Sequence, residues 1–259
     1  MTLREVRLRQ LHEDVVRRGS VQVPALARDH EVSQETIRRD LDRLADLGLI
    51  VRTRGGAVAP GSSLTELDIH LRAQEHRAEK RAIARVVVEQ LVTDGTSIAL
   101  DTGSTVLEVA RALRGRKVTV VTSSVPVVNA LVGTECSVVV LGGSVRARSL
   151  STVGPIAERA AEQFHCDLAL VSAPAMTPEL GPMDTDLEAI EIKRAFIRGA
   201  DRAYAVLDHS KLGRTAFSTI CATNQLTGLV TDDGADPAIL DAFQASGLEI
   251  IVGKRIHHD

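Results

Sequence analysis

The sequence predicts an α/β protein in which a small domain of three helices and a β-hairpin precedes a larger three-layer domain with a mainly parallel sheet. Three observations predict this fold class. The first sixty residues hold helix patterns separated by turn residues and close on a Gly-Gly turn. Beyond residue 92, short apolar runs alternate with helical patterns. Between these regions, residues 59–63 are rich in Pro, Gly and Ser and mark a break in composition.

The composition is that of a globular chain. Hydrophobic residues make up 44% and charged residues 25% of 259 residues, which excludes general disorder and allows two domains. Cys136, Cys166 and Cys221 are far apart, so neither a disulfide framework nor a metal site is expected, and a reducing, cytoplasmic compartment is favoured. No apolar run approaches the roughly 18 residues of a membrane span, so no membrane partner is expected.

Residues 1–60 form the first predicted domain. Thr2 can cap a helix that Gly19 ends. Pro24 suits the first turn of a second helix over residues 24–30. A third helix follows Ser33, a good N-cap, and stops at Gly48.

The third helix has a buried face and a basic face. Ile37, Leu41 and Leu44 fall on one apolar stripe. Arg38 and Arg39 lie off that stripe, in the half of a recognition helix that meets base edges and phosphates. Residues 49–58 then predict two short strands around Gly-Gly, with Arg52 and Arg54 on one face. Three helices and a basic hairpin together predict a winged helix-turn-helix.

Charge and aromatic content agree with duplex DNA as the partner. The whole chain has a net charge of −3, but its first sixty residues carry 11 arginines against 9 acidic residues. They hold no aromatic residue, which argues against modules that stack single-stranded bases. A solvated helix with ordinary surface arginines is the alternative interpretation.

A family resemblance rests on the residues Val32-Ser33-Gln34-Glu35-Thr36-Ile37-Arg38-Arg39-Asp40-Leu41 and Arg54-Gly55-Gly56-Ala57. This pattern resembles the DeoR family of bacterial transcription regulators. The resemblance implies that the segment is a DNA-reading helix and wing, that the partner is a double-stranded DNA operator, and that the usual role is repression of sugar-metabolism operons. It assigns DNA contacts to Ser33, Gln34, Thr36, Arg38, Arg39, Arg52 and Arg54.

Residues 61–91 are predicted to form a hinge and a linker helix, with a charged helical stretch from about residue 67 to residue 91. The pattern of Arg72, Glu79, Lys80, Ile83 and Ala84 also resembles the inter-domain helix of the family. The other interpretation is a helix that covers the next domain, and we expect both roles. His76 is expected on the solvated face of this stretch.

Residues 92–259 form the predicted effector-binding domain. Strands are expected at residues 97–100, 118–121, 137–141, 168–171, 203–207, 229–230 and 249–252. Helices are expected at residues 105–113, 155–164, 186–198 and 237–245. This alternation predicts a mainly parallel sheet covered on both faces.

Ligands of such sheets bind at the carboxyl ends of the strands, and polar and glycine residues collect there. Residues 101–105 (Asp-Thr-Gly-Ser-Thr) follow the first predicted strand and open a helix, while residues 122–124 and 142–144 end the next two strands. Glycine lets the backbone approach a ligand, hydroxyls donate hydrogen bonds, and a helix N-terminus presents free N–H groups to an anion.

Residues 208–213 end a later strand and add the cation of Lys211, with His209 expected only to flank the pocket. The chain has no nucleotide-binding glycine motif, so no nucleotide and no cofactor is expected. A small phosphorylated molecule fits best, and ordinary structural turns are the alternative. The predicted effector-binding residues are Asp101, Gly103, Ser104, Thr105, Thr122, Ser123, Ser124, Gly142, Gly143, Glu191, Lys193, Asp208 and Lys211.

The family resemblance covers these segments too, since they match the effector domain of DeoR-type regulators, which is similar to ribose-5-phosphate isomerase. It implies that a phosphorylated sugar or related metabolite binds here and weakens DNA binding. Residues 172–178 depart from the glycine-containing segment common in the family, which alters one wall of the pocket. Ser104 stands where many relatives have Thr and keeps the hydroxyl.

The alternative function is a phosphosugar isomerase with an N-terminal assembly domain. Isomerases of the similar fold carry an Asp-Gly-Ala-Asp-Glu cluster after a central strand, and their chemistry needs a carboxylate base. This chain has Asp167 alone in the corresponding region, so no catalytic residue is assigned. An activator would use the same contacts as a repressor. The duplex-reading motif and the resemblance imply a homo-oligomer, either a dimer or a tetramer.

Overall fold

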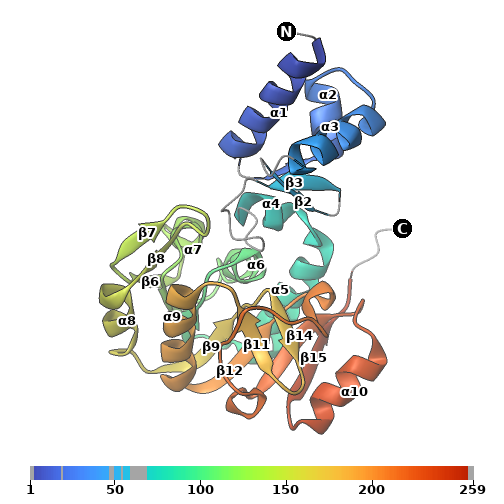
Figure 1. The fold of residues 1–259 in the computed structure, drawn as a ribbon. Helices are drawn as coiled ribbons and strands as arrows, with labels where there is room; N and C mark the ends of the chain where they lie inside the picture. Colours follow the sequence, from blue (N-terminus) through green and yellow to red (C-terminus); the bar gives the residue numbers. More distant parts are fainter. Residues whose placement is uncertain (1–2, 19, 47–49, 54, 59–68, 256–259) are drawn as a thin grey trace. The chain divides into compact units, whose positions relative to one another are not determined.

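The structure, a computed structural model, describes residues 3–18, 20–46, 50–53, 55–58 and 69–255 (Figure 1). The chain divides into two compact units, residues 1–68 and 69–259. Helices with a small antiparallel sheet make up the first unit, and a parallel sheet covered by helices makes up the second, which confirms the predicted fold class. The predicted limits of the three functional parts, 1–60, 61–91 and 92–259, stay a prediction.

The first unit packs its helices around one small apolar core. Ile37, Leu41 and Leu44 are all buried there, as their spacing predicts, together with Leu11 and Leu26. The helices are α1 (Leu3–Arg18), α2 (Val23–Asp29) and α3 (Gln34–Asp46).

The wing is part of a three-stranded sheet in the order β1-β3-β2, formed by β1 (Ser20–Gln22), β2 (Val51–Thr53) and β3 (Gly56–Val58). The hairpin of β2 and β3 was expected, whereas β1 was not, because three residues are too few to show an alternating pattern. A Cβ atom at position 56 would lie 1.9 Å from the carbonyl oxygen of Val21. Gly56 therefore allows β1 and β3 to pair.

The charged stretch before the second domain forms two helices instead of one, α4 (Ile69–Gln74) and α5 (Arg77–Leu91). His76 separates them in a left-handed conformation with φ 49°. The Nζ atom of Lys80 donates to the carbonyl oxygens of Arg72 and Glu75, both at 2.6 Å. These bonds satisfy carbonyls that a continuing helix would have used, which explains the break.

The second unit is built on a seven-stranded parallel sheet in the order β15-β14-β12-β9-β4-β5-β6. All the strands predicted from apolar runs are present, β4 with the predicted limits and the others with shifted ends. They are β4 (Ser97–Leu100), β5 (Thr119–Thr122), β6 (Ser137–Val140), β9 (Cys166–Val171), β12 (Ala200–Val206), β14 (Gly228–Asp232) and β15 (Glu249–Gly253).

Helices cover both faces of this sheet and make three layers (Figure 1). One face packs against α5, α6 (Ser104–Ala112) and α7 (Val125–Leu131), with Ile83, Val106 and Val127 buried in that layer. The other face packs against α8 (Pro155–Ala161), α9 (Leu187–Arg198) and α10 (Pro237–Ala245), with Phe196 and Phe243 buried there.

Short elements were missed in the sequence because two to four residues are too few to show an alternating or helical pattern. An antiparallel pair joins β7 (Ser144–Arg146) and β8 (Ser151–Val153). A second small sheet joins β10 (Ala175–Thr177), β11 (Gly181–Asp184) and β13 (Ser218–Thr219). Two 3₁₀ helices are η1 (His209–Lys211) and η2 (Thr223–Gln225). No described helix has the length and apolar character needed to cross a membrane.

Candidate DNA-reading helix and ligand site

The N-terminus of α3 is capped as the sequence predicts. Ser33 Oγ accepts a hydrogen bond from the backbone N–H of Thr36 at 3.2 Å, and the two hydroxyls lie 2.8 Å apart. Glu35 adds a negative charge in the first turn, where it complements the helix dipole. Ser33 and Thr36 therefore fix the start of the helix as well as lying on its exposed end.

Arg38 and Arg39 project from α3 into solvent, with 52% and 75% of their side chains exposed. Both lie near Glu35, at N–O distances of 3.7 Å and 3.3 Å. Gln34 is exposed on the same end of the helix. Exposed ion pairs are weak, so a DNA phosphate or base edge can replace Glu35 as the partner of either guanidinium.

Arg52 of the wing lies against α3 instead of projecting freely. Its Nε atom is 2.6 Å from Asp42, and its guanidinium also donates to the carbonyl oxygen of Gly56. In this arrangement Arg52 holds the wing to the recognition helix. Arg54, which was predicted to share its face, lies outside the described residues.

Asp40 is a positioning residue that the sequence pattern did not reveal. It is buried on α3 and accepts from Arg7 Nε of α1 at 2.7 Å. A carboxylate at 1% exposure inside a small core needs such a partner. This contact fixes the rotation of α3, and with it the direction in which Arg38 and Arg39 point.

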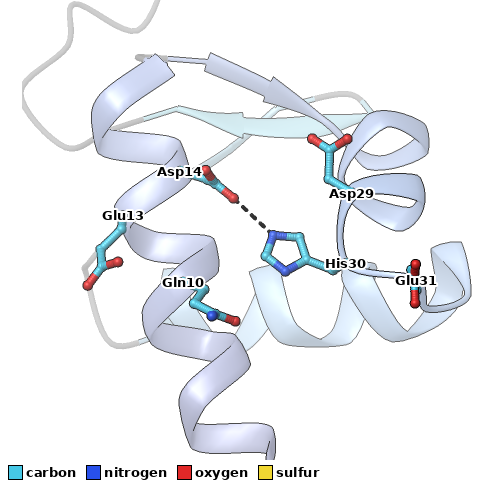
Figure 2. Close-up of a pocket in the computed structure, with 6 residues that line it drawn as sticks. All are labelled: Gln10, Glu13, Asp14, Asp29, His30 and Glu31. Atoms are coloured by element: carbon cyan, nitrogen blue, oxygen red, sulfur yellow. Dashed lines mark hydrogen bonds and ion pairs between the residues drawn. The ribbon is translucent and has the colours of Figure 1, made fainter.

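The first unit also has an acidic pocket of about 660 Å³, lined by Gln10, Glu13, Asp14, Asp29, His30 and Glu31. Figure 2 shows His30 and Asp14 pointing toward each other, joined by a 2.9 Å contact between Nε2 and Oδ2. Asp14 and Asp29 contact Arg18 and His30, so part of the negative charge of the pocket is compensated inside the unit. Across the described ranges, no group of three or more His, Cys, Asp and Glu side chains is arranged to hold a metal ion.

A buried charge network lies at the carboxyl edge of the large sheet. Lys193 of α9 places its Nζ 2.9 Å from Asp101, 3.1 Å from Asp184 and 2.6 Å from the carbonyl oxygen of Ser172. Lys193 and Asp101 are both almost fully buried. Burial acts to lower the pKa of Lys193, but the two carboxylates outweigh it and raise that pKa.

Lys193 therefore stays charged and joins α9 to β4 and β11. Asp101 and Lys193 were both predicted to bind the effector, and the structure brings them together. They form a buried ion pair with each other. Asp184 was not predicted, because its strand was missed. Both carboxylates are paired with one ammonium.

Ser172, from the segment that departs from the family pattern, closes this network. Its N–H and hydroxyl donate to Asp101 Oδ2 at 2.9 Å and 3.2 Å, and the hydroxyl also reaches the carbonyl oxygen of Thr102 at 2.5 Å. A Cβ at position 103 would lie 2.5 Å from Ser172 Oγ. Gly103, at φ 120°, is thus required both by its backbone conformation and by this close approach.

Gly103 is the N-cap of α6 and provides no side-chain cap, so the first-turn N–H groups of α6 have no partner from that residue. Ser104 and Thr105 place their hydroxyls in the same turn, and both are largely buried. This turn has the geometry of an anion site: a glycine, a helix N-terminus and hydroxyl donors.

The two neighbouring turns use their polar groups internally. Ser124 Oγ accepts from Val127 N–H at 3.4 Å, and Thr122 Oγ1 accepts from Ser124 N–H at 3.1 Å. Ser123 is buried, and its carbonyl oxygen accepts from Thr152 N–H. Thr122, Ser123 and Ser124 therefore shape the start of α7 and hold β8 beside it.

The two glycines of the Gly142-Gly143 turn differ in their surroundings. Gly143 has φ 147°, and a Cβ there would lie 2.8 Å from the carbonyl oxygen of Val153, so it allows β8 to approach. Gly142 is exposed, and a Cβ at that position would have no neighbouring atom within 4 Å.

Lys80 is the main site residue that the sequence did not reveal. It is buried on α5, and burial lowers its pKa, while the nearby Asp208 carboxylate opposes that shift and the nearby Lys211 ammonium adds to it. Asp208 accepts from Ser210 N–H at 3.2 Å and from the Ser210 hydroxyl, which orders the turn that carries Lys211. Two ammonium groups from distant parts of the sequence thus share one electrostatic environment.

His209 and His76 also meet here, contrary to the expectation that His76 lies on a solvated face. Their rings stand edge to face, with centroids 5.2 Å apart. His209 Nδ1 is 2.8 Å from Asp232 Oδ2, and Asp232 is completely buried at the end of β14. Because His76 and His209 are far apart in the sequence, only the three-dimensional structure shows that they are in contact.

Glu191 and Asp167 lie elsewhere. Glu191 is two positions from Lys193 on α9 and pairs instead with Arg194 at 2.6 Å, on a different side of the helix. Asp167 is near the amino end of β9, where its Oδ2 accepts from the N–H and the hydroxyl of Ser97, both at 2.7 Å. Asp167, the single acidic residue in the region where the isomerases carry their acidic cluster, therefore lies at the opposite edge of the sheet from the predicted ligand-binding turns.

A winged helix-turn-helix unit joined to a parallel α/β unit, with a polar, glycine-containing turn at its carboxyl edge, is the architecture of a two-domain transcription regulator. The chain belongs to the DeoR family of transcriptional regulators. Residues 7–63 match the DeoR-like helix-turn-helix domain, and residues 75–233 match the DeoR C-terminal sensor domain. This membership makes the protein a regulator of transcription and not an isomerase.

Curated relatives span nearly the same length. The chain is 32% identical to the HTH-type transcriptional regulator GolR of Listeria innocua over 91% of this chain and 93% of that one. It is 32% identical to the glycerol-3-phosphate regulon repressor of Escherichia coli K12, over 85% and 87% of the two chains. Among solved structures, ribose 5-phosphate isomerase A of Methanocaldococcus jannaschii matches 53% of this chain and 55% of its own, with 19% identity and a TM-score of 0.41.

Proposed function

We propose that this protein is a repressor of a sugar-metabolism operon. It binds a double-stranded DNA operator through α3 and the wing, and a phosphorylated sugar or related metabolite releases it. The helix-turn-helix match and the exposed Arg38 and Arg39 support the DNA contact. The sensor-domain match and relatives named as repressors, one of them of a glycerol-3-phosphate regulon, support the response to a phosphorylated compound.

The arrangement that supports the ligand proposal is the gathering of Lys80, Lys211 and the start of α6 at the carboxyl edge of the sheet. Lys80 is acted on by the Asp208 carboxylate as well as by the Lys211 ammonium, and Gly103 leaves the first turn of α6 without a side-chain cap. The strands that lead to these groups, β4 and β12, are separated only by β9, a span of about 10 Å. A dianionic phosphate at this edge would attract both ammonium groups and accept hydrogen bonds from the first-turn N–H groups of α6.

Lys80 offers a route from the ligand to the linker. Its Nζ donates to the carbonyl oxygens of Arg72 and Glu75, which end α4, the first described helix after residues 59–68. A phosphate that attracts the ammonium of Lys80 weakens those two bonds and so alters the end of α4. A ligand reduces DNA affinity in this way only if it binds the altered arrangement more tightly.

The experiment is a thermal-shift screen of the full chain against a panel of sugar phosphates, the matching free sugars and inorganic phosphate. A ligand of the native state raises the midpoint of unfolding. We expect at least one sugar phosphate to do so and to release the protein from DNA of its own upstream region. A panel in which free sugars act as well as their phosphates contradicts the phosphate site.

A further inference from the structure

The strand β6 at one edge of the large sheet exposes unpaired backbone groups. In the described part of the chain it pairs only with β5. The N–H groups of Ser137 and Leu141 donate to carbonyl oxygens on the β5 side. Because alternate residues of a strand direct their backbone groups to the same side, the N–H and C=O groups of Val138 and Val140 point away from β5.

The opposite edge of the sheet is protected, but the β6 edge is not. At β15, Glu249 lies at the start, Lys254 and Arg255 follow the end, and Arg255 pairs with Asp233 at 2.7 Å. Charges of this kind keep an edge strand from pairing with another chain. The sequence of β6, Ser-Val-Val-Val, has no charge and no proline.

Exposed apolar side chains gather around the same corner of the second unit. Val140, Val145, Ile156 and Leu187 are 52%, 67%, 62% and 57% exposed. They belong to β6, β7, α8 and α9, which lie together on one side of the unit in Figure 1. Thr152 Oγ1 of β8 donates to Leu141 O at 2.8 Å, which ties the β7–β8 pair to the end of β6. Val138 packs in the α5–α7 layer and Val139 in the α8–α10 layer, so Val140 lies on the face opposite α8 and α9 and the patch flanks both sides of the open edge.

We propose that this edge is the dimer interface, where β6 pairs antiparallel with β6 of a second copy of the chain. A two-fold axis at Val139 sets Val138 opposite Val140 of the partner. In that register the outward N–H and C=O groups of both residues bond across the interface, and Val139 faces its own copy as a non-hydrogen-bonded pair. The parallel sheets of both copies become one continuous sheet.

The features of the edge favour a second copy over an unrelated protein. An isologous interface needs a surface that complements itself, and an uncharged strand meets itself without opposing like charges. A winged helix-turn-helix regulator also gains from pairing, because two copies read two half-sites of one operator. The interface is independent of the ligand proposal, since its test needs neither DNA nor metabolite.

The first test is sedimentation equilibrium of the full chain in the absence of DNA. Val140→Pro removes an outward N–H, and Val140→Lys puts a charge at the edge, while the half-exposed side chain has little packing to lose. Phe217→Lys, at a 77% exposed apolar residue outside the patch, is the matched control. We expect the wild type and Phe217→Lys to dimerise alike, and both Val140 variants to dissociate at least about tenfold more readily.

The second test is a cysteine at the proposed two-fold axis. Opposed residues of a non-hydrogen-bonded pair have Cα atoms about 4.5 Å apart, within the range of a disulfide. Oxidised Val139→Cys should therefore yield a covalent dimer, above the background that the wild type and Phe217→Cys give. A monomeric wild type, or Val140→Lys with the wild-type mass on dilution, overturns the proposal. So does a dimer in which Val139→Cys does not crosslink.

Discussion

Arg38 and Arg39 are the residues on which DNA reading depends most directly. Replacing either with alanine should weaken operator binding by about 1–3 kcal/mol where the arginine contacts a base edge. Fluorescence anisotropy at fixed salt measures this, with Arg9→Ala, an exposed arginine of α1, as the control. Operator affinity that is unchanged in both variants rejects α3 as the reading helix.

Lys211 is the residue that separates ligand response from DNA binding. Lys211→Gln should leave operator affinity intact and raise the concentration of sugar phosphate needed for release by at least about tenfold, because a charge-assisted contact to phosphate is lost. Lys117→Gln makes the same change before β5, at the amino edge of the sheet. Release curves that coincide for the wild type and both variants place the phosphate elsewhere.

Asp167 gives a prediction of pH dependence. Hydrogen bonds from the side chain and backbone of Ser97 lower the pKa of Asp167. A lowered carboxylate pKa contributes stability above the ordinary value near 3.9, and the contribution disappears as the pH falls through the native pKa. Ser97→Ala should move the pKa of Asp167 upward and lower the free energy of unfolding at neutral pH. NMR titration of the carboxyl carbon checks this, and an unmoved pKa contradicts it.

At the residue scale, local chemistry was predictable and long-range partners were not. Ser33 caps α3, and Gly103 has positive φ, because each depends on adjacent backbone. The role of Lys80 depends on Asp208 and Lys211, more than a hundred residues away, so no local pattern reveals it. For Glu191, closeness in sequence was misleading: it lies two positions from Lys193, but its carboxylate pairs with Arg194.

At the scale of elements, α9 is held to the sheet by one buried ammonium. Lys193→Met should destabilise the second unit by about 3–5 kcal/mol, because Asp101 and Asp184 lose the charge that compensates their burial. Denaturant unfolding measures this, and Arg198→Met, at a 56% exposed position of the same helix, should change stability by less than about 0.5 kcal/mol. Adding Asp101→Asn to Lys193→Met should restore part of the loss.

Elements with a continuous apolar pattern were predictable, and those fixed by tertiary contacts were not. β4 and α10 match their predicted limits, since buried runs and caps define them locally. The break between α4 and α5 depends on Lys80 reaching back to two carbonyl oxygens. The strands β1 and β10 are three residues long and exist only through their partners.

At the scale of the whole molecule, the account is a thermodynamic linkage between two sites. If sugar phosphate lowers the affinity for operator DNA by some factor, bound operator must lower the affinity for sugar phosphate by the same factor. Isothermal titration of sugar phosphate into free protein and into the protein–DNA complex should give that equality. Sugar phosphate that binds free protein and the protein–DNA complex with the same affinity would show that the two sites are not coupled.

The most direct test of the central claim is footprinting of DNA upstream of the gene for this protein and its neighbours. At low ionic strength and without metabolite, the wild type should protect a defined stretch, and added sugar phosphate should remove that protection. Lys211→Gln should protect the same stretch and keep it in the presence of sugar phosphate. Absence of any protected stretch under these conditions, with folded wild-type protein, contradicts the account.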